Sequence, residues 1–164
     1  MVVSNTTVIL YLLKIRRADL LQNYTKTIFI PREVQEELLA GEERYRQEII
    51  LLQGLIFSQF IQVVTVPAIT NYGLDRGENS VLSLCAQKKD TIFLSDDAGA
   101  RKTARSRGYT TVGTLGILLH SLKSGKISST EFFKLLEELI GKGYYISTEL
   151  YAELVKRVNK IRKG

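Results

Sequence analysis

The segment "TIFLSDDAGARKTARSRG" at positions 91–108 contains the pattern that decides the fold. Its apolar part, positions 91–95, has the β-branched and aromatic residues of a buried strand. That run stops at Asp96 and Asp97, and a basic helical pattern follows and ends at Gly108. A strand that passes directly into a helix is the repeating unit of α/β domains. The segment also raises a question, because two carboxylates stand side by side at the end of an apolar strand.

The same alternation of strands and helices continues in both directions along the chain. Strands are predicted at 1–3, 26–30, 61–66, 91–95 and 109–114. Helices are predicted at 6–15, 18–24, 31–41, 42–60, 77–90, 97–108, 115–125, 128–143 and 147–161, with Pro31 as the first residue of its helix. This order predicts an α/β fold with a mainly parallel central sheet.

Length and the absence of a long linker or repeat predict a single domain over 1–164, with C-terminal helices at about 128–162 packing on it. The chain has 23 Lys and Arg against 17 Asp and Glu, a net charge of +6, which favours polyanionic partners. The apolar run at 48–66 contains too many polar residues for a membrane span, and the N-terminus lacks the features of a signal peptide. We therefore expect a cytoplasmic protein that does not enter a membrane.

Candidate site residues follow from the predicted topology, since parallel sheets bind ligands beyond the carboxyl ends of their strands. Asn5 and Thr6 follow the first strand, and Asp96 and Asp97 follow the fourth. Glu37 lies in the helix after the second strand, and Glu78 lies at the start of a later helix. Each carboxylate taken singly is also explained as a helix cap or as part of a solvated helix face.

Taken together, these carboxylates favour a metal site, because clustered negative charges repel and a divalent cation removes that cost. Oxygen donors suit Mg²⁺ or Mn²⁺. Zinc is disfavoured because His120 is the one histidine and Cys85 the one cysteine, and both are expected to be structural. A carboxylate-held ion beside a basic helix indicates phosphodiester chemistry, with that helix placed to contact a nucleic-acid backbone.

The ordered set of segments resembles the PIN-domain family, in particular a prokaryotic subgroup related to the VapC-type toxin ribonucleases. The resemblance covers nearly the whole chain and depends on "VVSNTTVILYLLKI", "IPREVQEELLAG", "GLDRGENSVLSLC", "IFLSDDAGARKTARSRG" and "TVGTLGILL". It implies a Rossmann-like, three-layer α/β/α sandwich. It also implies a Mg²⁺- or Mn²⁺-dependent endoribonuclease that acts on RNA, forms a homodimer and is paired with an antitoxin protein.

The resemblance also implies roles for individual residues. Asn5, Glu37, Glu78 and Asp97 fall on the four acidic positions of the family, and Thr6 falls on its small hydroxyl position. Glu37, Glu78 and Asp97 would bind the metal ion, and Asn5 would assist through its carbonyl oxygen. Asp96 would add a carboxylate beside Asp97. Backbone contacts to RNA are expected from four basic residues: Arg76, Arg101, Lys102 and Arg105.

Asn5 is a departure from the family pattern, since most members have Asp there. A neutral amide removes one charge from the metal site. The sequence therefore keeps a second hypothesis open, a catalytically weakened PIN-like module that binds RNA or a protein partner. A third, a phosphotransfer domain with paired Asp residues at a strand end, needs a lysine after a later strand, and the segment "TTVGTL" at 110–115 provides none.

Overall fold

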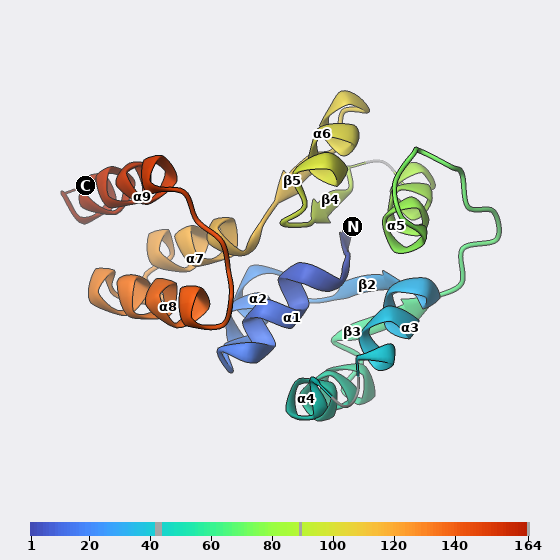
Figure 1. The fold of residues 1–164 in the computed structure, drawn as a ribbon, viewed down its shortest axis with the longest axis horizontal. Helices are drawn as coiled ribbons and strands as arrows, with labels where there is room; N and C mark the ends of the chain where they lie inside the picture. Colours follow the sequence, from blue (N-terminus) through green and yellow to red (C-terminus); the bar gives the residue numbers. More distant parts are fainter. Residues whose placement is uncertain (42–43, 89, 164) are drawn as a thin grey trace.

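The computed structural model describes residues 1–41, 44–88 and 90–163, and its centre is a parallel β-sheet (Figure 1). The strands are β1 (Val2–Ser4), β2 (Ile28–Pro31), β3 (Ile61–Val64), β4 (Ile92–Leu94) and β5 (Thr110–Val112). They lie in the order β3-β2-β1-β4-β5, and every neighbouring pair is parallel. The predicted α/β class with a parallel sheet is therefore confirmed.

Helices flank this sheet. They are α1 (Thr6–Lys14), α2 (Ala18–Tyr24), α3 (Arg32–Ala40), α4 (Arg46–Phe57), α5 (Arg76–Ala86), α6 (Ala98–Ser106), α7 (Thr114–Lys123), α8 (Ser129–Gly141) and α9 (Thr148–Lys163). Helix α5 packs on β1, β2 and β4, while α1 packs against α2, α3, α4 and α7. Helices α8 and α9 come last and pack on α7, away from α3 and α5 (Figure 1).

The central strands β1, β2 and β4 are short and mostly apolar because they are covered on both faces, whereas the edge strand β5 is Thr-Thr-Val and partly exposed. Val3, Ile28, Ile30 and Phe93 are fully buried. Burial of one such side chain stabilises the fold by about 1.5–3 kcal/mol. Cys85 is also fully buried in α5, as predicted for a structural cysteine.

The position of the site follows from the strand order. The chain leaves β1 toward β2 on one side, but it enters β4 on the other side of β1, so the direction of winding reverses between β1 and β4. Ser4 pairs with Leu94, and the Asn5 N–H donates to the Leu94 carbonyl oxygen at 3.1 Å. A crevice forms at such a switch point, and it is where open parallel sheets place their ligands.

Several predicted boundaries differ from the structure, and two of these differences have a clear cause in the backbone. Pro31 is the last residue of β2 instead of the first of a helix, because its ψ of 155° is extended, and α3 begins at Arg32. The helix predicted to end at 60 ends as α4 at Phe57, since Gln59 takes a left-handed conformation with φ of 60°. The predicted start of that helix at 42–43 and position 89 of the helix predicted at 77–90 lie outside the described residues.

The connection between α8 and α9 reaches back to the sheet. Tyr144 meets Tyr11 of α1 edge to face, with ring centroids 4.9 Å apart. Near the start of α8, Glu131 forms an ion pair with Arg17. Within the described ranges, no helix combines the length and apolar character needed to cross a membrane.

Candidate functional site

Carboxylates from three helices converge beside the switch point. Glu37 comes from α3, Asp75 and Glu78 from the start of α5, and Asp97 from the start of α6. The pKa of Glu78 is raised to about 7, mainly by burial and additionally by the negative charges of Asp75, Asp97 and Glu37. These groups therefore lie within electrostatic range of one another. We call the four carboxylates the acidic cluster.

Glu37 is held by hydrogen bonds from two other elements. The Thr6 hydroxyl donates to Glu37 Oε2 at 2.9 Å, and the backbone N–H of Gly77 also points to this carboxylate. A side chain at position 77 would collide with the Glu37 carboxylate, so glycine leaves room for this carboxylate beside the start of α5. Although Glu37 is exposed as a whole, burial of its carboxyl group still raises its pKa.

Asp75 and Glu78 form the N-terminal cap of α5. Asp75 Oδ1 accepts a hydrogen bond from the Glu78 N–H at 2.7 Å, and Glu78 in turn interacts with the backbone N–H of Asp75. This reciprocal arrangement is a capping box, and it fixes the direction of both side chains. The structural explanation of Glu78 as a helix-start residue therefore holds together with its place in the acidic cluster.

Asp97 is likewise both a cap and a member of the acidic cluster. Its Oδ1 accepts a hydrogen bond from the Ala100 N–H at 2.7 Å at the start of α6. Asp97 is exposed, so its carboxylate remains open to solvent on the side of Glu78. Capping of this kind leaves a carboxylate oxygen available for another ligand.

Asn5 joins the ends of β1 and β4. Its Oδ1 accepts from both the backbone N–H and the hydroxyl of Thr7, at 3.2 and 2.9 Å. Its Nδ2 donates to the Ser95 hydroxyl at 2.8 Å, and that hydroxyl also accepts from the Asp97 N–H. The Asn5 oxygen already has two donors, so metal ligation by this oxygen, which stays a prediction, requires one of them to be displaced.

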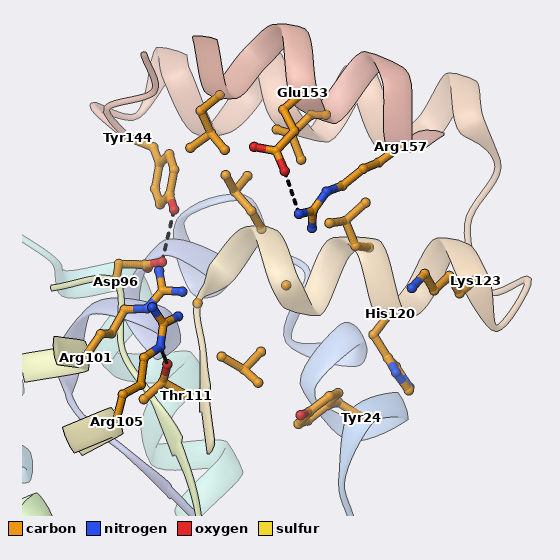
Figure 2. A pocket seen from close by; sticks show the side chains of 17 residues that line it. Tyr24, Asp96, Arg101, Arg105, Thr111, His120, Lys123, Tyr144, Glu153 and Arg157 are labelled. Atoms are coloured by element: carbon orange, nitrogen blue, oxygen red, sulfur yellow. Dashed lines mark hydrogen bonds and ion pairs between the residues drawn. The ribbon is translucent and has the colours of Figure 1, made fainter. Parts of the chain in front are cut away.

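Asp96 lies apart from the acidic cluster, although it is the neighbour of Asp97. Thr114 donates to it from its N–H at 2.8 Å and from its hydroxyl at 2.6 Å, and the Tyr144 hydroxyl donates at 3.0 Å. Figure 2 shows Asp96 beneath Tyr144, on the side of Arg101. Burial, together with the charge of Asp96, raises the pKa of Tyr144, so the phenol keeps the proton that it donates. Asp96 therefore fastens α7 and the segment after α8 to the end of β4, and its predicted catalytic role stays a prediction.

The acidic cluster suits a divalent cation by its donor chemistry. Hard carboxylate oxygens are the ligands that Mg²⁺ and Mn²⁺ prefer. Burial is the main cause of the raised pKa values of Glu37 and Glu78, and the neighbouring carboxylates add to it. Among residues 1–41, 44–88 and 90–163, no three His, Cys, Asp or Glu side chains are already close enough to form a finished metal site. A cation would thus have to draw the carboxylates closer together.

The predicted RNA-contacting residues fall into two groups. Arg76 lies beside the acidic cluster, is exposed, and is 3.8 Å from Glu33. Lys102 is exposed on α6. Arg101 and Arg105, also on α6, instead line a cavity on the Asp96 side (Figure 2). His120 is an exposed residue of α7 at the edge of that cavity, where its ring meets Tyr24 edge to face.

Three residues of this region were missed by the sequence analysis as site residues. Asp75 was noted only as a loop residue, although the Asp-x-x-Glu spacing from 75 to 78 is a capping-box signal. Gly77 and Tyr144 act through contacts with Glu37 and Asp96, which are distant in the sequence. No local pattern announces such contacts.

A family model described as a PIN domain matches residues 1–160. No curated protein matches the chain.

Proposed function

The chain belongs to the PIN-domain family, and we propose on this basis that it is a metal-dependent endoribonuclease. The observation that carries the proposal is the convergence of Glu37, Glu78 and Asp97 from three helices at the crevice between β1 and β4. PIN domains are generally nucleases, and the acidic cluster has the donor set that a divalent cation requires.

Glu37, Glu78 and Asp97 would hold Mg²⁺ or Mn²⁺, which when bound supplies an activated water and offsets charge on the phosphate. Thr6 and Gly77 orient the Glu37 carboxylate through their hydrogen bonds. Asn5 and Ser95 position the backbone of Asp97. With a pKa of about 7, Glu78 is partly protonated at neutral pH, so it releases a proton when a cation binds.

Four basic side chains would contact the RNA backbone: Arg76, Arg101, Lys102 and Arg105. Arg101, Lys102 and Arg105 lie on α6, directly after Asp96 and Asp97 in the sequence. Arg76 is the first residue of α5. Phosphate contacts of this kind fix the position of a strand and carry no sequence information. Affinity for RNA should therefore fall steeply with salt.

A role as the toxin of a toxin–antitoxin pair, as a homodimer in the cytoplasm, is part of the same proposal. It is supported by the subgroup resemblance of "SNTT" at 4–7 and "RGEN" at 76–79. Co-purification of the chain with the product of a neighbouring gene, followed by inhibition of RNA cleavage by that product, would test it.

The experiment for the nuclease is cleavage of a pool of structured RNAs by the purified protein with Mn²⁺. Asp97→Asn should reduce cleavage about a hundredfold or more, the effect of losing about 3 kcal/mol of transition-state stabilisation. It should leave Tm unchanged, because Asn caps a helix as well as Asp does. Asp90→Asn is the matched control, since Asp90 lies at the opposite end of β4 and has a left-handed backbone that suits Asn. Equal cleavage by Asp97→Asn and wild type would refute the assignment.

One observation favours the second candidate function, a weakened module that binds RNA or a protein partner. The Asn5 oxygen accepts two hydrogen bonds from Thr7, which lowers its capacity to bind a metal ion. This alternative expects RNA binding that persists in EDTA and no cleavage with Mn²⁺. Asn5→Asp would then create activity, because a carboxylate can accept from Thr7 and still ligate an ion.

A further inference from the structure

A cavity of about 580 Å³ opens on the opposite side of the Asp96–Asp97 pair from the acidic cluster. Its walls come from α6, β5, α7 and α9, and Tyr144 closes one end (Figure 2). The volume lies in the range of about 300–1,000 Å³ that is typical of small-molecule sites. The cavity is thus large enough to hold a nucleotide.

One wall of the cavity carries two guanidinium groups, those of Arg101 and Arg105. Within the described residues, the buried Nε atom of Arg101 has no hydrogen-bond partner, and neither Arg101 nor Arg105 forms a salt bridge. Arg105 donates from Nε to the Thr111 hydroxyl at 2.8 Å, which adds no negative charge. Figure 2 shows the two arginine side chains next to each other, so an anion bound there would relieve their repulsion.

The carboxylates in the cavity are already engaged. Asp96 accepts from Thr114 and Tyr144, and Glu153 is paired with Arg157. Asp96 therefore contributes negative charge at one end but has few lone pairs left for the arginines. The region around Arg105 keeps a positive potential, and its N–H groups away from Nε remain available for a phosphate.

The other wall has leucines beside the Glu153–Arg157 ion pair. Leu119 of α7 and Leu150 and Leu154 of α9 line it, and Leu150 is 38 % exposed. A cavity with guanidinium groups on one side and leucines on the other matches a ligand with a phosphate at one end and a flat, weakly polar ring at the other. A nucleotide has this division, because its phosphate is anionic and its base is not.

The cavity is also adjacent to the proposed catalytic centre. Asp97 belongs to the acidic cluster, Asp96 lines the cavity, and their Cα atoms are consecutive, about 3.8 Å apart. The acidic cluster and the cavity are therefore close enough for a single RNA strand to reach both.

We propose that this cavity is a subsite for the nucleotide adjacent to the cleaved bond, with Arg101 and Arg105 on its phosphate and the leucines of α7 and α9 against its base. The proposal rests on the proposed action of the chain on RNA. It adds a specificity-determining position built by α9, which lies far from the acidic cluster along the chain. A free nucleotide shares this chemistry, and an acidic peptide with apolar side chains is the competing macromolecular ligand.

The test measures binding of a fluorescein-labelled, single-stranded RNA to the full chain in EDTA, so that it reads binding without cleavage. Arg105→Gln is compared with Arg46→Gln, an identical change at an exposed position of α4. We expect Arg105→Gln to weaken binding about fivefold to tenfold and to lower the salt slope by about 0.7. Arg46→Gln should leave both quantities unchanged. Leu150→Ala should weaken binding about twofold without changing the salt slope, since the Leu150 side chain would contact the base and not the phosphate.

Equal RNA affinity in Arg105→Gln and Arg46→Gln would overturn the subsite, as would a wild-type chain that does not bind RNA in EDTA. Adenosine monophosphate and a decaglutamate peptide serve as competitors. Loss of monophosphate binding in Arg105→Gln with unchanged RNA affinity would identify a site for free nucleotides and overturn the proposal. Displacement of RNA by decaglutamate at equal charge concentration would also overturn the proposal and would identify the cavity as a site for an acidic peptide. Because no arm measures cleavage, a failure here is distinct from a failure of the nuclease proposal.

Discussion

The acidic cluster and the arginine-lined cavity lie next to the same dipeptide, Asp96–Asp97, and they concentrate charges of opposite sign. On one side, Glu37, Glu78 and Asp97 gather negative charge, and the pKa of Glu78 rises to about 7. On the other side, Arg101 and Arg105 gather positive charge. Asp96 and Asp97 are chemically identical, but the first is surrounded by donors and the second is open to solvent. The surroundings of each carboxylate therefore set the contacts that it can make.

The strongest test of this difference is the stability of the two aspartate variants. Asp96→Ala removes the acceptor of Thr114 and Tyr144 and should lower the free energy of unfolding by about 3 kcal/mol. Asp97→Asn should change it by less than about 0.5 kcal/mol, because the cap of α6 is kept. Urea denaturation of both variants measures this. Equal losses would mean that both residues are structural.

Metal binding should also distinguish Asp96 from Asp97, but here the larger effect is expected for the Asp97 variant. At a Mn²⁺ concentration ten times its Kd, wild type should gain about 1.4 kcal/mol of stability, seen as a rise in Tm. Asp97→Asn should lose this gain, and Asp96→Asn should keep it relative to its own metal-free Tm. If Asp96→Asn also loses the gain, Asp96 belongs to the acidic cluster and the division proposed here is wrong.

The pH dependence of the free energy of unfolding should come in part from Glu78 in the acidic cluster. The folded chain keeps the Glu78 proton up to about pH 7, while the unfolded chain releases it near the ordinary value of 4.5. The contribution of Glu78 to stability is therefore lost as pH rises from about 4.5 to 7. Because Glu78 is partly solvated, we expect Glu78→Gln to raise Tm at pH 8 by only about 2–4 °C, equivalent to about 1 kcal/mol.

The same variant should have little effect at pH 4.5, where Glu78 is protonated in the folded chain. Glu149→Gln, at the exposed start of α9, provides a control for general loss of acidic charge. A Tm gain for Glu78→Gln that is as large at pH 4.5 as at pH 8 would contradict the electrostatic explanation.

The smallest expected change in the free energy of unfolding is that of substituting Arg101 in the cavity wall. Arg101→Met removes a guanidinium whose buried Nε lacks a partner in the described part of the chain. The free energy of unfolding should stay the same or rise by up to about 0.5 kcal/mol. A loss above about 1 kcal/mol would show that Asp96 holds Arg101, which would make the cavity wall electrically neutral. Thermal unfolding at low salt gives the most sensitive reading.

Most of the fold could be predicted from the sequence because buried parallel strands are short apolar runs between helical patterns. The runs at 26–30 and 91–95 are examples that match β2 and β4. Pro31 was placed in the wrong element because a proline φ near −60° fits both a helix and an extended strand end. Only the ψ angle separates the two, and pairing with β3 sets it.

The candidate site was predictable in part. The ends of the first and fourth predicted strands were expected to meet at one edge, which brings Asn5 and Asp97 together, and the pairing of Ser4 with Leu94 has this effect. The separation of Asp96 from Asp97 could not be predicted. It depends on Thr114 and Tyr144, which lie 18 and 48 residues further along the chain.

The pairing of β1 with β4 has a consequence for the order in which the protein is made. Position 5 can donate to Leu94 only after most of the chain has left the ribosome, and Asp97 is the last member of the acidic cluster to be synthesised. Domains form from the N-terminus during synthesis, but a contact between distant strands must wait for its second partner. A nascent chain that already displays Glu37 and Glu78 therefore lacks a complete site. If the chain cleaves RNA, it can cleave the mRNA that encodes it only when translation of that mRNA is well advanced.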